Sequence, residues 1–200
     1  MLVLLVASGT LEQVSERLGY SLDQVRRLPA AIHQLRKSKS FRDSYGEAVL
    51  QRIAPIIASI PEAPTPDNID LLDALSEVVD TGEAQLMAIA AATSCTLLIS
   101  GDKRAIADLA ASQATDCIRE LQGRLVTLEA VLWMLVTDAG AGTVRSAFAP
   151  VMNHKTLRIV LSPHAAAEQQ RCLAGIQSYY NELAQSAGGL LFNPAPESLG

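Results

Sequence analysis

The chain has 200 residues, of which 49% are hydrophobic, 4% aromatic and 18% charged, with a net charge of −5. The apolar fraction excludes a disordered chain, and the acidic balance excludes a global field that draws the protein to nucleic acid or anionic lipid. The charged fraction lies below the roughly 25% usual for soluble domains, which indicates that a partner covers part of the surface.

The first half of the chain predicts one strand followed by helices. Leu2 to Val6 is an unbroken apolar run that predicts a strand buried on both faces. Capping boxes at Thr10 and at Ser21 predict two helix starts, and Gly19 ends the first of these helices. Further helices are expected at residues 30–36, 45–59 and 69–79, with a stiff proline-rich linker at 61–66.

The second half alternates helices with strands. Helices are expected at residues 81–92, 102–111 and 124–136, strands at 95–99 and 156–161, and a last amphipathic helix around 173–183. This alternation after an N-terminal strand favours an α/β fold with a parallel sheet. The chain is expected to be loose from Gly188 onward.

The cysteines and the apolar segments indicate the cellular compartment of the protein. Cys95, Cys117 and Cys172 have no metal-type spacing and lie in apolar surroundings, so we expect reduced core thiols in a cytoplasmic protein. No run reaches the roughly 20 apolar residues of a membrane span, and no membrane contact is expected.

Two acidic residues are candidates for a functional site. Glu83 lies in the first turn of a predicted helix, and Asp102 follows a predicted strand, at the edge where open parallel sheets bind ligands. Together with Asp80 they are candidate oxygen ligands for Mg²⁺ or Mn²⁺, and Lys103 and Arg104 are candidates for holding phosphate. The alternative is that Glu83 and Asp102 merely favour helix starts through the helix dipole.

The sequences of residues 79–90 (VDTGEAQLMAIA) and 97–106 (LLISGDKRAI) resemble those of PIN-domain proteins. The resemblance implies a three-layer α/β/α fold with a parallel sheet over residues 1–120, a helical C-terminal extension over 121–187 and a loose tail over 188–200. It also implies metal-dependent cleavage of RNA, with Glu83 and Asp102 as catalytic metal ligands.

The chain departs from the family pattern at three places. The segment Leu2–Val6 carries no acid, Gln34 stands where the family has a glutamate, and Gly101 stands where it often has a second acid. We therefore expect an incomplete acidic site, or a natural start that lies upstream of Met1.

Basic residues and one buried acid suggest further roles. Seven of the sixteen Lys and Arg residues lie within residues 26–52, and Arg36, Lys37 and Lys39 are candidate nucleic-acid contacts. Residues 10–28 also fit a helix-turn-helix that could bind DNA. Glu129, inside an apolar helix, is either a hidden site acid or a carboxylate paired with a neighbouring arginine.

Two functional classes remain open from the sequence. The first is a metal-dependent ribonuclease of toxin type that acts on single-stranded RNA and is covered by an antitoxin-like protein partner. The second is a non-catalytic module that binds RNA or protein. Tyr179 and Tyr180 suggest a homodimer face, and packing on the chain's own sheet explains them equally well.

Overall fold

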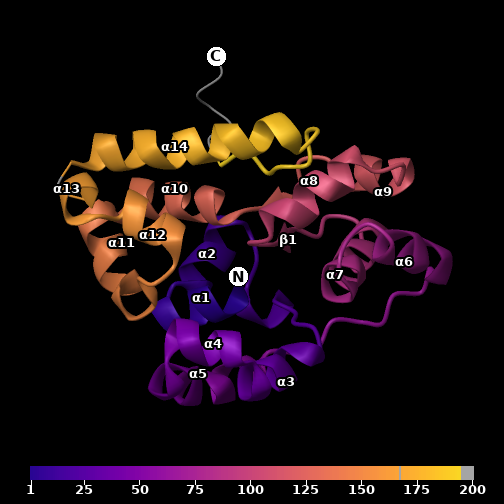
Figure 1. The fold of residues 1–200 in the computed structure, drawn as a ribbon, viewed down its shortest axis with the longest axis horizontal. Helices are drawn as coiled ribbons and strands as arrows, with labels where there is room; N and C mark the ends of the chain where they lie inside the picture. Colours follow the sequence, from indigo (N-terminus) through magenta and orange to yellow (C-terminus); the bar gives the residue numbers. More distant parts are fainter. Residues whose placement is uncertain (167, 195–200) are drawn as a thin grey trace. The chain divides into compact units, whose positions relative to one another are not determined.

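The structure is a computed structural model that describes residues 1–166 and 168–194, and its helices and strands are labelled in Figure 1. The chain divides into two compact units. Unit 1 comprises residues 1–63 and 132–176, and unit 2 comprises residues 64–131 and the chain from Gln177 onward. The boundary between the units falls within helices α10 (Leu128–Ala139) and α14 (Gln169–Ser186). The boundary expected at residue 120 lies inside unit 2 instead.

Unit 1 is helical. Its α-helices are α1 (Leu2–Ser8), α2 (Leu11–Arg17), α3 (Ala30–Lys37), α4 (Lys39–Tyr45), α5 (Glu47–Ser59), α11 (Ala141–Phe148), α12 (Lys155–Val160) and α13 (Pro163–Ala166). Short 3₁₀ helices span Leu22–Gln24 and Ala149–Val151. Helix α1 packs against α2, α5 and α11.

The strand predicted at Leu2–Val6 is wrong, because these residues form helix α1. A short apolar run has no periodicity that separates a buried strand from a buried helix. Surrounding helices bury Val3–Ala7 on all sides, so the backbone has no neighbouring strand and satisfies its hydrogen bonds internally as a helix. Gly9 ends the helix at φ 71°, a left-handed conformation that glycine adopts without strain.

The strand predicted at residues 156–161 is also wrong. The segment forms helix α12, with Thr156, Leu157 and Val160 buried along one face. The spacing of these side chains matches a helix turn better than the alternation of a strand. Helix α4 was not expected from the sequence; the side chain of Ser38 caps it by accepting a hydrogen bond from the N–H of Phe41 at 3.3 Å.

Unit 2 contains a small parallel sheet among helices. Its elements are α6 (Ile69–Ser76), α7 (Thr81–Ala92), β1 (Leu98–Ile99), α8 (Lys103–Ala111), α9 (Thr115–Glu120) and β2 (Leu125–Val126), with the adjoining parts of α10 and α14. Leu98 pairs with Leu125 and Ile99 with Val126 in parallel register. Helix α7 packs against α6, α9 and β1. The helix predicted from Arg124 therefore begins later, at Leu128, after the two residues of β2.

Part of the expected loose tail is held in place in unit 2. The N–H of Leu125 donates to the carbonyl of Leu190 at 3.0 Å, and the N–H of Phe192 donates to the carbonyl of Leu125 at 2.9 Å. Leu190 and Leu191 are buried in the hydrophobic core of the unit. The expected tail residues 195–200 lie outside the described residues.

The predicted three-layer α/β/α fold is wrong. Within residues 1–166 and 168–194, strands are limited to β1 and β2, each two residues long, and helices make up most of the rest. Two of the predicted strands became helices, so the sheet in the described residues is limited to two short strands and is too small for the predicted three-layer arrangement. The structure therefore does not support the PIN-like fold that the wording of residues 79–106 suggested.

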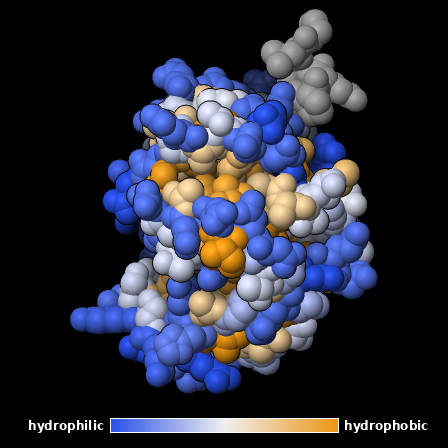
Figure 2. All heavy atoms as spheres, turned by 90° about the vertical axis from the view of Figure 1, so that its right-hand side faces the viewer, coloured by the Kyte–Doolittle hydropathy of each residue, from blue (hydrophilic) through white to orange (hydrophobic). Residues whose placement is uncertain are grey.

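One of the three thiols differs from the expectation that all of them lie in the core. Cys117 and Cys172 are buried as expected, whereas Cys95 is exposed. In the described part of the chain, no helix combines the length and the apolar character that crossing a membrane requires. Hydrophilic residues cover most of the face seen in Figure 2, and apolar residues gather near its centre.

Candidate metal centre

Two helices of unit 2 begin at aspartates that cap them. At the start of α7, Asp80 Oδ1 accepts hydrogen bonds from the backbone N–H groups of Gly82 (3.0 Å) and Glu83 (3.1 Å). At the start of α8, Asp102 Oδ1 accepts two backbone N–H groups of the first turn, both at 3.0 Å. Asp102 therefore has the helix-start role expected as the alternative for it, and Asp80, for which this role was not predicted, has it as well.

The same acids also meet in space. One carboxylate oxygen from each of Asp80, Glu83 and Asp102 lies within 4.8 Å of the other two. Asp80 and Glu83 share the start of α7, and α7 packs against β1, which leads directly into Asp102. The structure thus brings together all three acids that the sequence suggested as metal ligands.

The N–H of Asp102 is also held from the strand side. It donates to the Oγ of Ser100 at 3.1 Å, and Ser100 is buried. No role in the site was predicted for this serine from the sequence. Its signal was its place two residues before an acid at the end of a predicted strand, where a hydroxyl can close a short turn.

The acids hold a proton between them. Burial, followed by the hydrogen bond to Asp80 and then the charges of Asp80 and Asp102, raises the pKa of Glu83 from 4.5 to about 7. Hydrogen bonds from the side chain and backbone of Glu83 lower the pKa of Asp80, and the charge of Arg104 lowers it further. Below pH 7 and without a cation, the protonated form of Glu83 predominates and donates a hydrogen bond to the ionised Asp80.

This arrangement predicts a pH-dependent stability. Because folding raises the pKa of Glu83, the folded state binds this proton more tightly than the unfolded state between pH 4.5 and about 7. The associated stability is present below pH 4.5 and lost as the pH rises through 7. We expect the melting temperature of Glu83→Gln minus that of the wild type to increase from pH 5 to pH 8, because glutamine stays neutral while Glu83 loses its proton. A difference that stays flat in thermal melts over this range would contradict the shared proton.

The donor set fits a hard divalent cation. Mg²⁺ and Mn²⁺ prefer oxygen ligands, and Mg²⁺ commonly takes few carboxylates and completes its shell with water. The exposed Asp80 and the half-buried Glu83 and Asp102 leave one side of the cluster open to solvent. A cation bound here would replace the proton on Glu83 as the charge that holds the carboxylates together.

The two basic residues after Asp102 lie in different surroundings. Arg104 acts on Asp80 through its charge. The Nζ of Lys103 lies 2.6 Å from Oε1 of Glu129 and 5.3 Å from the ring centroid of Tyr179. Glu129 is fully buried and pairs with this lysine, whereas the sequence suggested an arginine. Lys103, which was expected to hold phosphate, is therefore paired with a buried acid instead.

The remaining basic candidates lie in unit 1. Arg36, Lys37 and Lys39 are exposed where α3 ends and α4 begins. Unit 1 carries 12 of the Lys and Arg residues against 8 Asp and Glu, whereas unit 2 carries 4 against 13. The weakly acidic chain is therefore divided into a basic unit and a strongly acidic one.

Other candidates from the sequence are not assembled into a site. Gln34 lies exposed on α3 in unit 1, whereas the three acids belong to unit 2. The second helix of the helix-turn-helix expected at residues 10–28 is the single 3₁₀ turn Leu22–Gln24. Arg27 is buried and donates to the carbonyl of Ile57 and to Glu62, both at 3.0 Å, so it does not face a groove of DNA.

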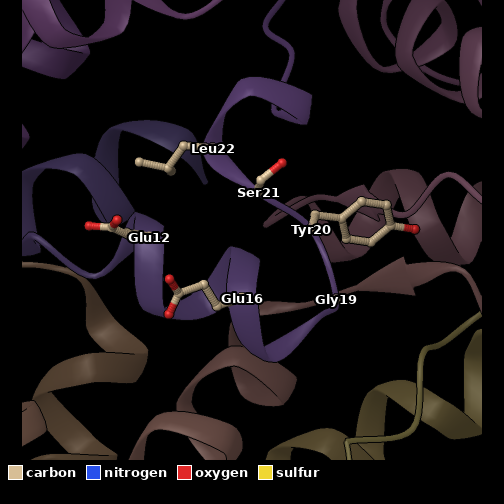
Figure 3. A pocket seen from close by; sticks show the side chains of 6 residues that line it. All are labelled: Glu12, Glu16, Gly19, Tyr20, Ser21 and Leu22. Atoms are coloured by element: carbon tan, nitrogen blue, oxygen red, sulfur yellow. The ribbon is translucent and has the colours of Figure 1, made fainter.

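Unit 1 also has an open hollow, of about 370 Å³ (Figure 3). It is lined by Glu12, Glu16, Gly19, Tyr20, Ser21 and Leu22. Figure 3 shows the carboxyl groups of Glu12 and Glu16 on one side of α2 and the Tyr20 ring pointing away from them. The hollow contains none of the candidate metal ligands.

No protein-family model, curated protein or solved structure matches the chain. The resemblance of residues 79–106 to PIN-domain proteins is therefore supported neither by a family match nor by the fold. Function has to be inferred from the geometry of the site.

Proposed function

We propose that the protein is a divalent-cation-dependent phosphodiesterase that acts on single-stranded RNA. The observation that carries the proposal is the meeting of Asp80, Glu83 and Asp102, whose oxygens lie within 4.8 Å of one another. Three carboxylates from two helix starts form the oxygen-rich, partly exposed site that Mg²⁺ or Mn²⁺ requires.

Each residue of the site would have a separate role in cleavage. A bound divalent cation supplies positive charge that polarises a phosphodiester and lowers the pKa of an attacking water. Asp80 and Asp102 hold the cation with oxygens on carboxylates that their cap hydrogen bonds already orient. Glu83 gives up its proton when the cation binds, and Arg104 can steady a phosphate oxygen near Asp80.

The charge of unit 1 supports a polyanionic substrate. Arg36, Lys37 and Lys39 are exposed close to Phe41, which is half-buried and packs edge-on against Tyr45 with ring centroids 5.8 Å apart. Basic side chains beside a partly exposed aromatic ring favour single-stranded RNA, whose unstacked bases are free to stack on such rings.

Cleavage assays test the catalytic part of the proposal. We expect the protein to cleave a single-stranded RNA oligonucleotide with Mg²⁺ or Mn²⁺ and to lose cleavage with a chelator. Asp102→Asn and Glu83→Gln are expected to lower the cleavage rate by roughly a hundredfold or more, because each removes a charged ligand. Asp116→Asn, which changes an exposed acid of unit 2, serves as the matched control. Cleavage that survives both site variants would remove the assignment.

RNA binding by unit 1 is tested separately. Replacing Arg36, Lys37 and Lys39 together by alanine is expected to weaken binding to a fluorescent RNA oligonucleotide by about tenfold or more, and to reduce the salt dependence of binding. The control replaces three other exposed basic residues of unit 1, Lys155, Arg158 and Arg171, in the same way. Equal losses in both triple variants would show that binding depends on net charge and not on this surface.

The two assays also separate the alternative function. RNA binding that needs the basic surface, without cleavage under any cation, would make the protein a non-catalytic RNA-binding module. The charge of unit 1 favours this second function independently of the metal centre, because phosphate contacts by Lys and Arg need no cation.

A further inference from the structure

Unit 2 contains an ion pair between Lys103 and the buried Glu129 that has no part in the proposed cleavage reaction. The side chain of Glu129 is 0% exposed, while that of Lys103 is 40% exposed. Among the described residues, neither carboxylate oxygen of Glu129 has a hydrogen-bond partner, although Oε1 lies 2.6 Å from the lysine Nζ. The distance defines an ion pair even where the angles do not define a hydrogen bond, so the charge of Lys103 compensates for the burial of Glu129.

The sheet register places this pair at the edge that carries the metal centre. Ile99 pairs with Val126 in parallel, and the N–H of Ser100 donates to the carbonyl of Val126 at 3.1 Å. Asp102 comes three residues after Ile99, and Glu129 comes three residues after Val126. Because the carboxyl ends of parallel strands lie at the same edge of a sheet, the two acids follow corresponding ends of β1 and β2.

The pair joins the first turns of two helices. Lys103 is the first residue of α8, and Glu129 lies in the first turn of α10. The segment between β1 and α8 is three residues long and ends in Asp102, which caps α8. The position of the first turn of α8 therefore sets the position of the Asp102 carboxylate relative to Asp80 and Glu83 on α7.

We propose that the Lys103–Glu129 ion pair positions Asp102 and thereby sets the affinity of the three-carboxylate site for a divalent cation. The inference rests on the proposed function, because it assumes that the site binds such a cation. Both residues act through α8 and need no contact with the cation. Mg²⁺ and Mn²⁺ demand ligand oxygens at well-defined distances, so a small displacement of Asp102 weakens binding.

Mn²⁺ affinity of the full chain, measured by calorimetry or by the spin-resonance signal of free Mn²⁺, tests this role. The decisive variant is Lys103→Met/Glu129→Met, which keeps the net charge and leaves no buried unpaired carboxylate. We expect its Mn²⁺ dissociation constant to rise by roughly tenfold or more, as is typical when a residue that orients a metal ligand is removed. The control Asp116→Asn/Arg119→Gln, an exposed ion pair of the same unit, is expected to bind as the wild type does.

Single variants separate positioning from simple charge effects. Lys103→Met removes a positive charge near the site, so electrostatics alone would strengthen cation binding, whereas loss of positioning weakens it. Lys103→Arg keeps the ion pair and is expected to bind Mn²⁺ within about threefold of the wild type. Glu129→Asp keeps both charges but shortens one side chain, and a smaller loss of affinity is expected; this variant also provides the measurement if the double variant does not fold.

The outcomes distinguish the two proposals. A wild-type chain that does not bind Mn²⁺ would overturn the proposed function and the role of the pair with it. Wild-type binding with unchanged affinity in the double variant, or tighter binding by Lys103→Met, would overturn the positioning role alone. Weaker binding in both, with rescue by Lys103→Arg, supports it.

Discussion

Lys103→Met is expected to lower the free energy of unfolding by about 3 kcal/mol. Among the described residues, Lys103 is the cation that pairs with Glu129, so the substitution leaves this carboxylate fully buried and without that charge. Breaking a buried ion pair by removing one partner typically costs 3–5 kcal/mol, and the 40% exposure of the lysine side chain places the expected value at the lower end. Urea denaturation followed by circular dichroism measures this loss.

The double variant Lys103→Met/Glu129→Met provides the comparison. Replacing both partners by apolar side chains of similar length removes the unpaired charge, so stability is expected to return to within about 1 kcal/mol of the wild type. If the single and double variants were equally unstable, the loss would come from side-chain packing and not from the buried charge. The same two proteins serve the Mn²⁺ measurement, which reports positioning and not stability.

Arg124→Met is the second substitution with a large expected effect, again about 3 kcal/mol. The guanidinium of Arg124 donates to the carbonyls of Ala90 (2.6 Å) and Thr93 (2.5 Å) at the end of α7, and to those of Thr96 and Glu120, both at 2.7 Å. The last carbonyls of a helix have no partner within the helix. Methionine retains the apolar stem but removes these four hydrogen bonds, of which those to Ala90 and Thr96 are half-buried, and hydrogen bonds that involve a charged group contribute about 1.5–3 kcal/mol each.

A neighbouring arginine provides the control for Arg124. Arg119 makes exposed ion pairs with Asp116 and Glu120, and such pairs contribute about 0–1 kcal/mol. Arg119→Met is therefore expected to change the urea midpoint little. A loss for Arg124→Met that does not exceed the loss for Arg119→Met would show that the four carbonyl contacts do not stabilise unit 2.

The sequence predicted most helices through local signals. The acids at positions 80 and 102 correctly marked the starts of α7 and α8, because an aspartate side chain accepts backbone N–H groups of the first turn. The apolar spacing in α3, α5, α6 and α14 predicted these helices as well. Such signals involve residues three or four apart, so the chain carries them whatever surrounds it.

Short apolar segments were predicted poorly because their structure depends on their neighbours. Leu2–Ser8 and Lys155–Val160 became helices among other helices, whereas Leu125–Val126, expected at the start of a helix, found a parallel partner in β1. The fold class followed these errors, since a large parallel sheet needs more strands than the described chain forms. The family resemblance was misleading for the same reason, because it rested on the local sequence of residues 79–106 and not on the surroundings of these residues in the fold.

The sequence by itself determined the helix starts, the acidic and basic regions, and the three carboxylates that are able to bind a cation. The tertiary structure decided that these carboxylates meet within 4.8 Å, that burial and the neighbouring acids raise the pKa of Glu83, and that Lys103 pairs with Glu129. Helix caps depend on bonds between near neighbours along the chain. The metal centre and the ion pair depend on packing between segments about twenty or more residues apart, and on the burial that packing imposes on charge.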